Sequence, residues 1–131
     1  MEMHGFAGSI LHVDVTTGES SSQPLDLEEA RRFLGGWGMN AKLAFDLVPP
    51  RCDARAPEMP IIIGAGVLTA TSAPSTPKAF ITTKCPAAGT VTTAVSGGDF
   101  GARLKWAGYD HLVLTGRAAE QLFVDQAAKL E

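Results

Sequence analysis

Alternation of apolar and polar positions predicts a half-buried strand near the start of the chain. Between Ser9 and Val15 every second residue is apolar, which places His12 and Asp14 on the strand's outer face. Other short runs rich in Val, Ile, Thr or Phe also predict strands, because these residues suit a pleated surface. The further strands are expected at residues 20–22, 61–64, 79–83, 91–95, 111–115 and 122–124.

Apolar residues three and four positions apart predict three helices instead. Asp26 is a good N-cap for the first, whose apolar stripe is Leu27, Ala30 and Leu34. The helices are expected at residues 27–34, 39–47 and about 99–107, with stops at Gly35-Gly36, Pro49-Pro50 and Gly108. Trp37 and Trp106 flank these helices and are expected to anchor the core.

These elements predict an α+β fold with short, mainly antiparallel strands and about three helices. The chain has 131 residues, which suits a single domain over residues 1–131. A net charge of −3 offers no basic field for nucleic acid. No apolar run approaches a membrane span, and the N-terminus does not resemble a secretion signal. We therefore expect a cytoplasmic protein.

Familiar catalytic motifs are missing from the sequence. His4, His12 and His111 lie far apart along the chain, so a metal site built from them is not expected. Cys52 and Cys85 are too few for a disulfide framework, and Cys85 is interpreted as structural rather than nucleophilic.

Two stretches rich in small and hydroxyl residues are candidates for binding a ligand. The loop 64–80 ends near Lys78, and the corner VSGGDFG contains Ser96, Gly97 and Gly98. Glycine lets backbone approach a ligand closely, and a helix that starts near Gly98 would point free N–H groups at an anion. Ordinary turns with a solvated lysine explain the same residues.

Four blocks of sequence, in order, resemble the N-terminal domain of the aldehyde ferredoxin oxidoreductase family. They are GFAGSILHVDVTTGE, LGGWGMNAKLAFDLVPP, GAGVLTATSAPSTPKAFITTKCPAAGTV and SGGDFGARLKWAGYDHLVLTGRA. The resemblance runs from Gly5 to about Val124 and implies a part of the tungstopterin-binding domain. In that family the metal is held by pterin dithiolenes and electrons pass through a four-iron cluster to ferredoxin.

By this resemblance, Lys78, Ser96, Gly97 and Gly98 would contact the pterin and its phosphate. Two departures weaken that expectation. Thr76-Pro77-Lys78 stands where the family has Gly-Gly-Arg, and lysine lacks the bidentate fork of arginine. Val95 stands where the family usually has an asparagine, so a polar contact to the pterin is lost.

The family's domain is longer and is followed by helical domains that carry the cluster cysteines and acid–base residues. Two cysteines cannot hold a four-iron cluster, so we expect no iron–sulfur cluster on this chain and no catalytic residue. Three readings stay open: a fragment or small subunit of a tungstopterin oxidoreductase, a self-associating binding or assembly module, and a folded relic without ligand. The expected partners are accordingly a larger catalytic subunit or a second copy in a homodimer, with ferredoxin reached only through such a subunit.

Overall fold

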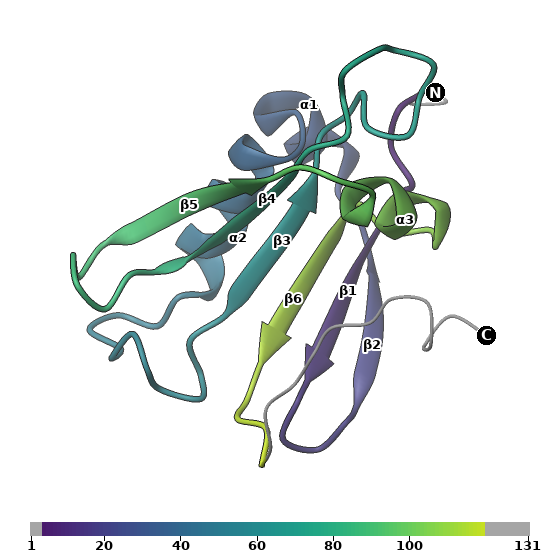
Figure 1. Cartoon of the computed structure of the whole chain (residues 1–131). Coiled ribbons are helices and arrows are strands. Elements are labelled where there is room, and N and C mark those ends of the chain that lie inside the picture. The colour runs from purple at the N-terminus through teal and green to yellow at the C-terminus, as the bar shows by residue number, and fades with distance from the viewer. Residues whose placement is uncertain (1–3, 120–131) are drawn as a thin grey trace.

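The computed structural model describes residues 4–119, which form one six-stranded sheet with three helices (Figure 1). The strands are β1 (Ser9–Asp14), β2 (Ser20–Pro24), β3 (Ile61–Ala65), β4 (Ala79–Lys84), β5 (Val91–Ser96) and β6 (His111–Thr115). The helices are α1 (Leu27–Phe33), α2 (Trp37–Leu47) and α3 (Phe100–Trp106). This confirms the predicted α+β class. The strand expected at 122–124 lies outside the described residues.

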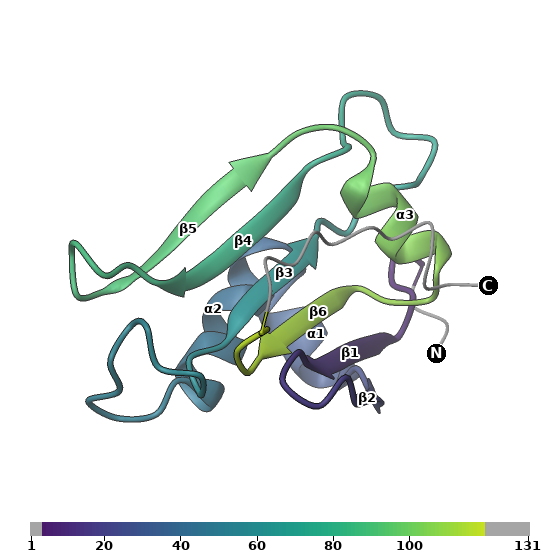
Figure 2. The same ribbon diagram turned by 60° about the horizontal axis from the view of Figure 1, so that its bottom comes forward.

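The strand order is β2-β1-β6-β3-β4-β5, and the β1–β6 pairing is parallel while the other pairings in this sheet are antiparallel. Strand β6 therefore lies between the antiparallel β1–β2 hairpin and the β3–β4–β5 meander, parallel to β1 and antiparallel to β3 (Figure 2). Sequence pattern alone does not reveal this crossover, because β6 enters the sheet between strands that precede it by many residues.

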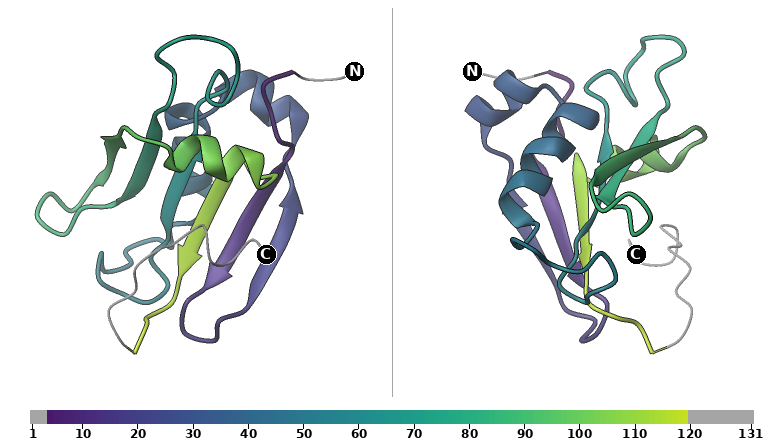
Figure 3. Two further views of the ribbon diagram at one scale, coloured as in Figure 1. Left: turned by 45° about the vertical axis from the view of Figure 1, so that its right-hand side comes forward. Right: turned by 90° about the vertical axis from the view of Figure 1, so that its left-hand side faces the viewer.

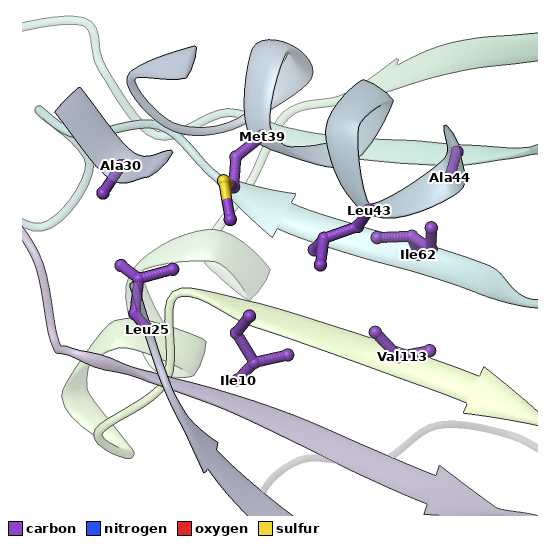
Figure 4. Packing of buried hydrophobic residues seen from close by; sticks show 8 residues of the cluster. All are labelled: Ile10, Leu25, Ala30, Met39, Leu43, Ala44, Ile62 and Val113. Carbon is purple, nitrogen blue, oxygen red and sulfur yellow. The ribbon is translucent and has the colours of Figure 1, made fainter. Parts of the chain in front are cut away.

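Helices α1 and α2 cover one face of the sheet, and α3 lies on the other face at one end (Figure 3). The main core therefore forms between the first two helices and β1, β3 and β6, as Figure 4 shows. Its buried apolar residues are Ile10, Leu25, Ala30, Met39, Leu43, Ala44, Ile62 and Val113. Removing their apolar surface from water is the main stabilising contribution to this layer.

The helix ends follow their local chemistry. Asp26 caps α1 as predicted, since its carboxylate accepts from Glu28 N at 2.8 Å and from Glu29 N at 3.2 Å. Gly108 ends α3 with φ 93°, a left-handed conformation that glycine adopts without strain. Helix α2 begins at Trp37, two residues before the predicted start.

Several predictions about side-chain burial are wrong. Trp37 and Trp106 are 64% and 72% exposed, so neither anchors the core. Of the stripe expected on α1 only Ala30 is buried, while Leu27 and Leu34 are exposed. Leu27, Leu34 and Trp37 lie outside the contact of α1 and α2 with the sheet, and Trp106 belongs to α3 on the other face.

Candidate functional site

The predicted ligand residues meet at one end of the β4–β5 hairpin. Ala79 pairs with Ser96, so Lys78 lies beside Gly97 just beyond the ladder. Lys78 and the Ser96–Gly98 corner are all exposed. Gly98 adopts φ 89°, and no atom lies within 4 Å of where a Cβ on Gly97 or Gly98 would stand. The fold thus brings the two candidate stretches together and leaves their backbone open.

Hydroxyl groups organise the loop that leads to this corner. The buried Thr69 donates through Oγ1 to Thr76 O at 2.8 Å, and Thr76 donates through Oγ1 to Leu68 O at 2.9 Å and Ala73 O at 3.0 Å. These bonds satisfy the carbonyls of a loop with no regular ladder. The threonines of this stretch therefore hold the loop in place rather than face a ligand.

The third helix is less suited to anion binding than the sequence suggested. It begins at Phe100 and has 7 residues, and its N-cap is Asp99, whose carboxylate pairs with Arg103 at 3.6 Å. A negative side chain at this end opposes a second anion. The open backbone of Gly97 and Gly98, not the helix end, is the feature of the corner that a ligand can approach.

A buried polar pair under the sheet was not anticipated. Asn40 on α2 donates through Nδ2 to Phe80 O at 2.8 Å, with Thr82 Oγ1 at 3.2 Å and Ile62 O at 3.3 Å. Its Oδ1 lies 2.9 Å from His111 Nδ1. Since the amide nitrogen already donates to β3 and β4, the oxygen must accept and His111 Nδ1 must carry the proton.

Gly64 makes room for this pair. A Cβ there would stand 2.3 Å from Asn40 Oδ1 and 2.4 Å from His111 Nδ1, closer than any side chain tolerates. Burial lowers the pKa of His111 from 6.5 to about 4, with Asp110 opposing the shift and Lys105 adding to it. His111 is therefore a neutral structural group that links α2 to the sheet.

A second network holds the N-terminal segment against α3. The Lys105 side chain is 7% exposed, and its ammonium donates to Gly5 O and to Val67 O, while Asp110 Oδ1 lies 3.7 Å away. Asp110 in turn accepts from the backbone N–H groups of Ala7 at 3.0 Å and Gly8 at 2.7 Å. Burial lowers the pKa of Lys105, and the Asp110 charge counteracts it.

The Lys105 side chain is therefore largely buried, whereas Arg103 on the same helix is exposed. The prediction that His12 lies on the outer face of its strand is wrong. His12 shares the face of Ile10, which the helices cover, and its Nε2 is buried without a partner among the described residues. Residue type alone did not predict that the side chains of Lys105 and His12 would be buried.

Within residues 4–119, no three or more His, Cys, Asp or Glu side chains lie close enough together to hold a metal ion. Cys52 and Cys85 are both unpaired and half-buried. Nor is any helix within this range long and apolar enough to cross a bilayer.

Comparison with known proteins shows the class to which this fold belongs. Residues 10–126 match the N-terminal domain of aldehyde ferredoxin oxidoreductase, and the chain belongs to that family. The tungsten-containing aldehyde ferredoxin oxidoreductase of Pyrococcus furiosus is 39% identical over 122 residues, and that of Thermococcus kodakarensis is 38% identical over the same length. Each alignment covers 93% of this chain and 20% of the relative, so the chain spans about a fifth of their length.

A solved structure confirms the fold. The active-site complex BamBC of benzoyl coenzyme A reductase, determined with 1,5-dienoyl-CoA, superposes with a TM-score of 0.86 at 32% sequence identity. The match covers 89% of this chain and 18% of that one. The α+β architecture is thus that of a domain found within larger oxidoreductases.

Proposed function

We propose that this chain forms part of the platform for a tungstopterin cofactor in an oxidoreductase of the aldehyde ferredoxin oxidoreductase family, and that it supplies no catalytic residue. Membership of the family supports this role, because the curated relatives are tungsten-containing enzymes. The observation that carries it is the open corner where Lys78 meets Ser96, Gly97 and Gly98.

The chemistry of the corner fits an anionic, polar group. The Lys78 side chain takes part in none of the ion pairs within residues 4–119, so its charge is available to a phosphate. Within the described part of the chain, the Ser96 hydroxyl donates only to its neighbour Gly97 O at 3.2 Å, and Ser96 is exposed. Val95, 55% exposed on the same strand, offers an apolar contact and no hydrogen bond.

In this role the residues bind and orient the cofactor. The Lys78 ammonium would hold phosphate, the glycine backbone would lie against the pterin, and the hydroxyl-bonded loop would keep both in register. The tungsten centre, when bound, supplies the redox chemistry. The acid–base groups and the cluster belong, in this proposal, to the remaining four-fifths of the relatives' length.

The test is native mass spectrometry of the chain purified from a host that makes tungstopterin. We expect a retained pterin mass, and we expect Lys78→Ala to lower its occupancy at least tenfold, the scale of about 1.5–3 kcal/mol for a hydrogen bond to a charged group. Lys78→Arg keeps the charge and adds a fork, so it should retain the cofactor. Equal occupancy in the wild type and Lys78→Ala would refute the site.

A second candidate is a self-associating module without catalytic activity. Strand β5 lies at the sheet edge, and Val91 and Val95 on it are 42% and 55% exposed. An unpaired apolar edge is a template for another strand, here from a second copy or from a larger subunit. The same spectra test this idea, because a strictly monomeric chain at roughly micromolar concentration would contradict a homodimer of standard interface size.

A further inference from the structure

A basic hollow lies at the end of the β4–β5 hairpin opposite the proposed pterin corner. It encloses about 350 Å³ between the 49–60 loop and the 85–90 turn. Figure 1 shows that loop and that turn at the lower left. The lining residues are Arg51, Cys52, Asp53, Ala54, Arg55, Lys84, Pro86 and Gly89.

Three cations and one carboxylate line this hollow, although the whole chain is acidic with a net charge of −3. The carboxylate is already engaged, since Asp53 Oδ1 accepts from Arg55 N at 2.7 Å. None of the ion pairs found within residues 4–119 involves Arg51, Arg55 or Lys84. The hollow therefore concentrates positive charge that the described part of the chain does not neutralise.

The framework that carries these charges is held by backbone hydrogen bonds. The Lys84 ammonium donates to Cys52 O at 2.6 Å, which ties the loop to the end of β4 and leaves further N–H donors on the ammonium. Arg117 donates to Arg55 O at 3.3 Å and so holds the backbone of the loop at that residue. Ala56 N also donates to Asp53 O at 3.1 Å, which closes the turn that contains Arg55.

Arg51 adopts φ 59°, a left-handed conformation that costs energy for a side chain with a Cβ. The following amide closes the turn, with Cys52 N donating to Pro49 O at 3.2 Å. A loop held in this way loses little conformational entropy on binding, which favours a small ligand that binds without rearranging the loop.

We propose that this hollow binds a phosphate-bearing small molecule. Arginine forks and a lysine charge match the oxygens of a phosphate or diphosphate. A volume of about 350 Å³ falls in the usual range for small-molecule sites. The scarcity of aromatic lining argues against an apolar ligand as the recognised part.

This site is separate from the proposed pterin corner. Lys84 pairs with Val91 at one end of the β4–β5 ladder, and Ala79 pairs with Ser96 at the other. The six residues of β4 between them span roughly 17 Å at the strand rise of about 3.3 Å per residue. One ligand group cannot contact both sites, so either can fail without the other.

The experiment titrates the 131-residue chain with pyrophosphate at about 0.15 M salt, where exposed charges are screened. Calorimetry measures affinity, and amide NMR shifts locate the site. We expect saturable binding with shifts centred on Cys52, Arg55 and Gly89. Arg55→Gln and Lys84→Met should each weaken binding at least tenfold, and acetate at the same concentration should not compete.

A control variant, Arg32→Gln, removes a charge on α1, which Figure 1 shows at the top, away from the two loops of the hollow at the lower left. It should leave pyrophosphate affinity within twofold. Arg55→Gln keeps the Lys84–Cys52 bond, so its loss of binding cannot be ascribed to a loosened loop. Absence of saturation, equal weakening by Arg32→Gln, or competition by acetate would overturn the proposal.

Discussion

Lowering the pH should destabilise this protein through one residue, His111. Its Nδ1–H is committed to Asn40 Oδ1, and its Nε2 is buried without a partner among residues 4–119. A second proton would have to sit on Nε2, where it would face no acceptor in those residues. An unsatisfied buried donor and the desolvation of a charge both oppose protonation.

The direction of the change in stability with pH follows from the number of protons that the folded and unfolded states bind. The pKa of His111 is lowered from 6.5 to about 4 in the fold, so in that interval the unfolded chain binds a proton that the native state does not. The free energy of unfolding therefore has its full value above the unfolded pKa of 6.5 and is lost as pH falls toward the folded value. At 1.36 kcal/mol per pKa unit, the loss is about 3 kcal/mol.

Urea unfolding at a series of pH values from about 7 to about 4 measures this loss, since the transition midpoint follows stability when the slope is constant. Circular dichroism should be the probe, because Trp37 and Trp106 are already exposed in the native state and report little burial. His111→Asn is the control: its amide can donate to Asn40 in place of Nδ1 and does not titrate.

The difference between the two proteins isolates His111, because other titrating groups contribute to both and cancel. We expect the wild type to lose about 3 kcal/mol more than His111→Asn over this range. Parallel pH profiles for the two proteins would refute the reasoning, as would an NMR titration of the His111 ring with a midpoint near 6.5.

Two further predictions concern the buried polar groups. Gly64→Ala should lower the free energy of unfolding by about 1–3 kcal/mol, since its Cβ would stand 2.3 Å from Asn40 Oδ1. Gly97→Ala, in open space, should change it by less than about 0.5 kcal/mol; the midpoints of urea unfolding measure both, and equal effects would contradict the packing argument. Lys105→Met should cost about 3 kcal/mol by leaving the buried Asp110 without its cation, measured in the same way, and a neutral effect would show that the ammonium is not needed.

Local signals in the sequence predicted the elements well. Asp26 and Gly108 mark helix ends through their own hydrogen bonds and backbone preference, and both lie where expected. The strand at His111–Thr115 has the predicted bounds, because a short, mostly apolar run between turn residues needs little context. The burial of single side chains was harder to predict. Lys105 lies under the N-terminal segment, and Trp106 next to it faces solvent.

The sequence by itself determined the α+β class, the order of strands and helices along the chain and the family resemblance. It also identified the two candidate stretches around Lys78 and Ser96, which the fold then brings together. These follow from local periodicity, turn chemistry and blocks of residues in order. The contact between Asn40 and His111, 71 positions apart, and the basic hollow between two distant loops were decided only by the tertiary structure. The first depends on the crossover that inserts β6 between β1 and β3, and the second on the β3–β4–β5 pairing that sets Lys84 and the 85–90 turn beside the loop before β3. Pairing between distant strands is set by packing of the whole sheet rather than by neighbouring residues.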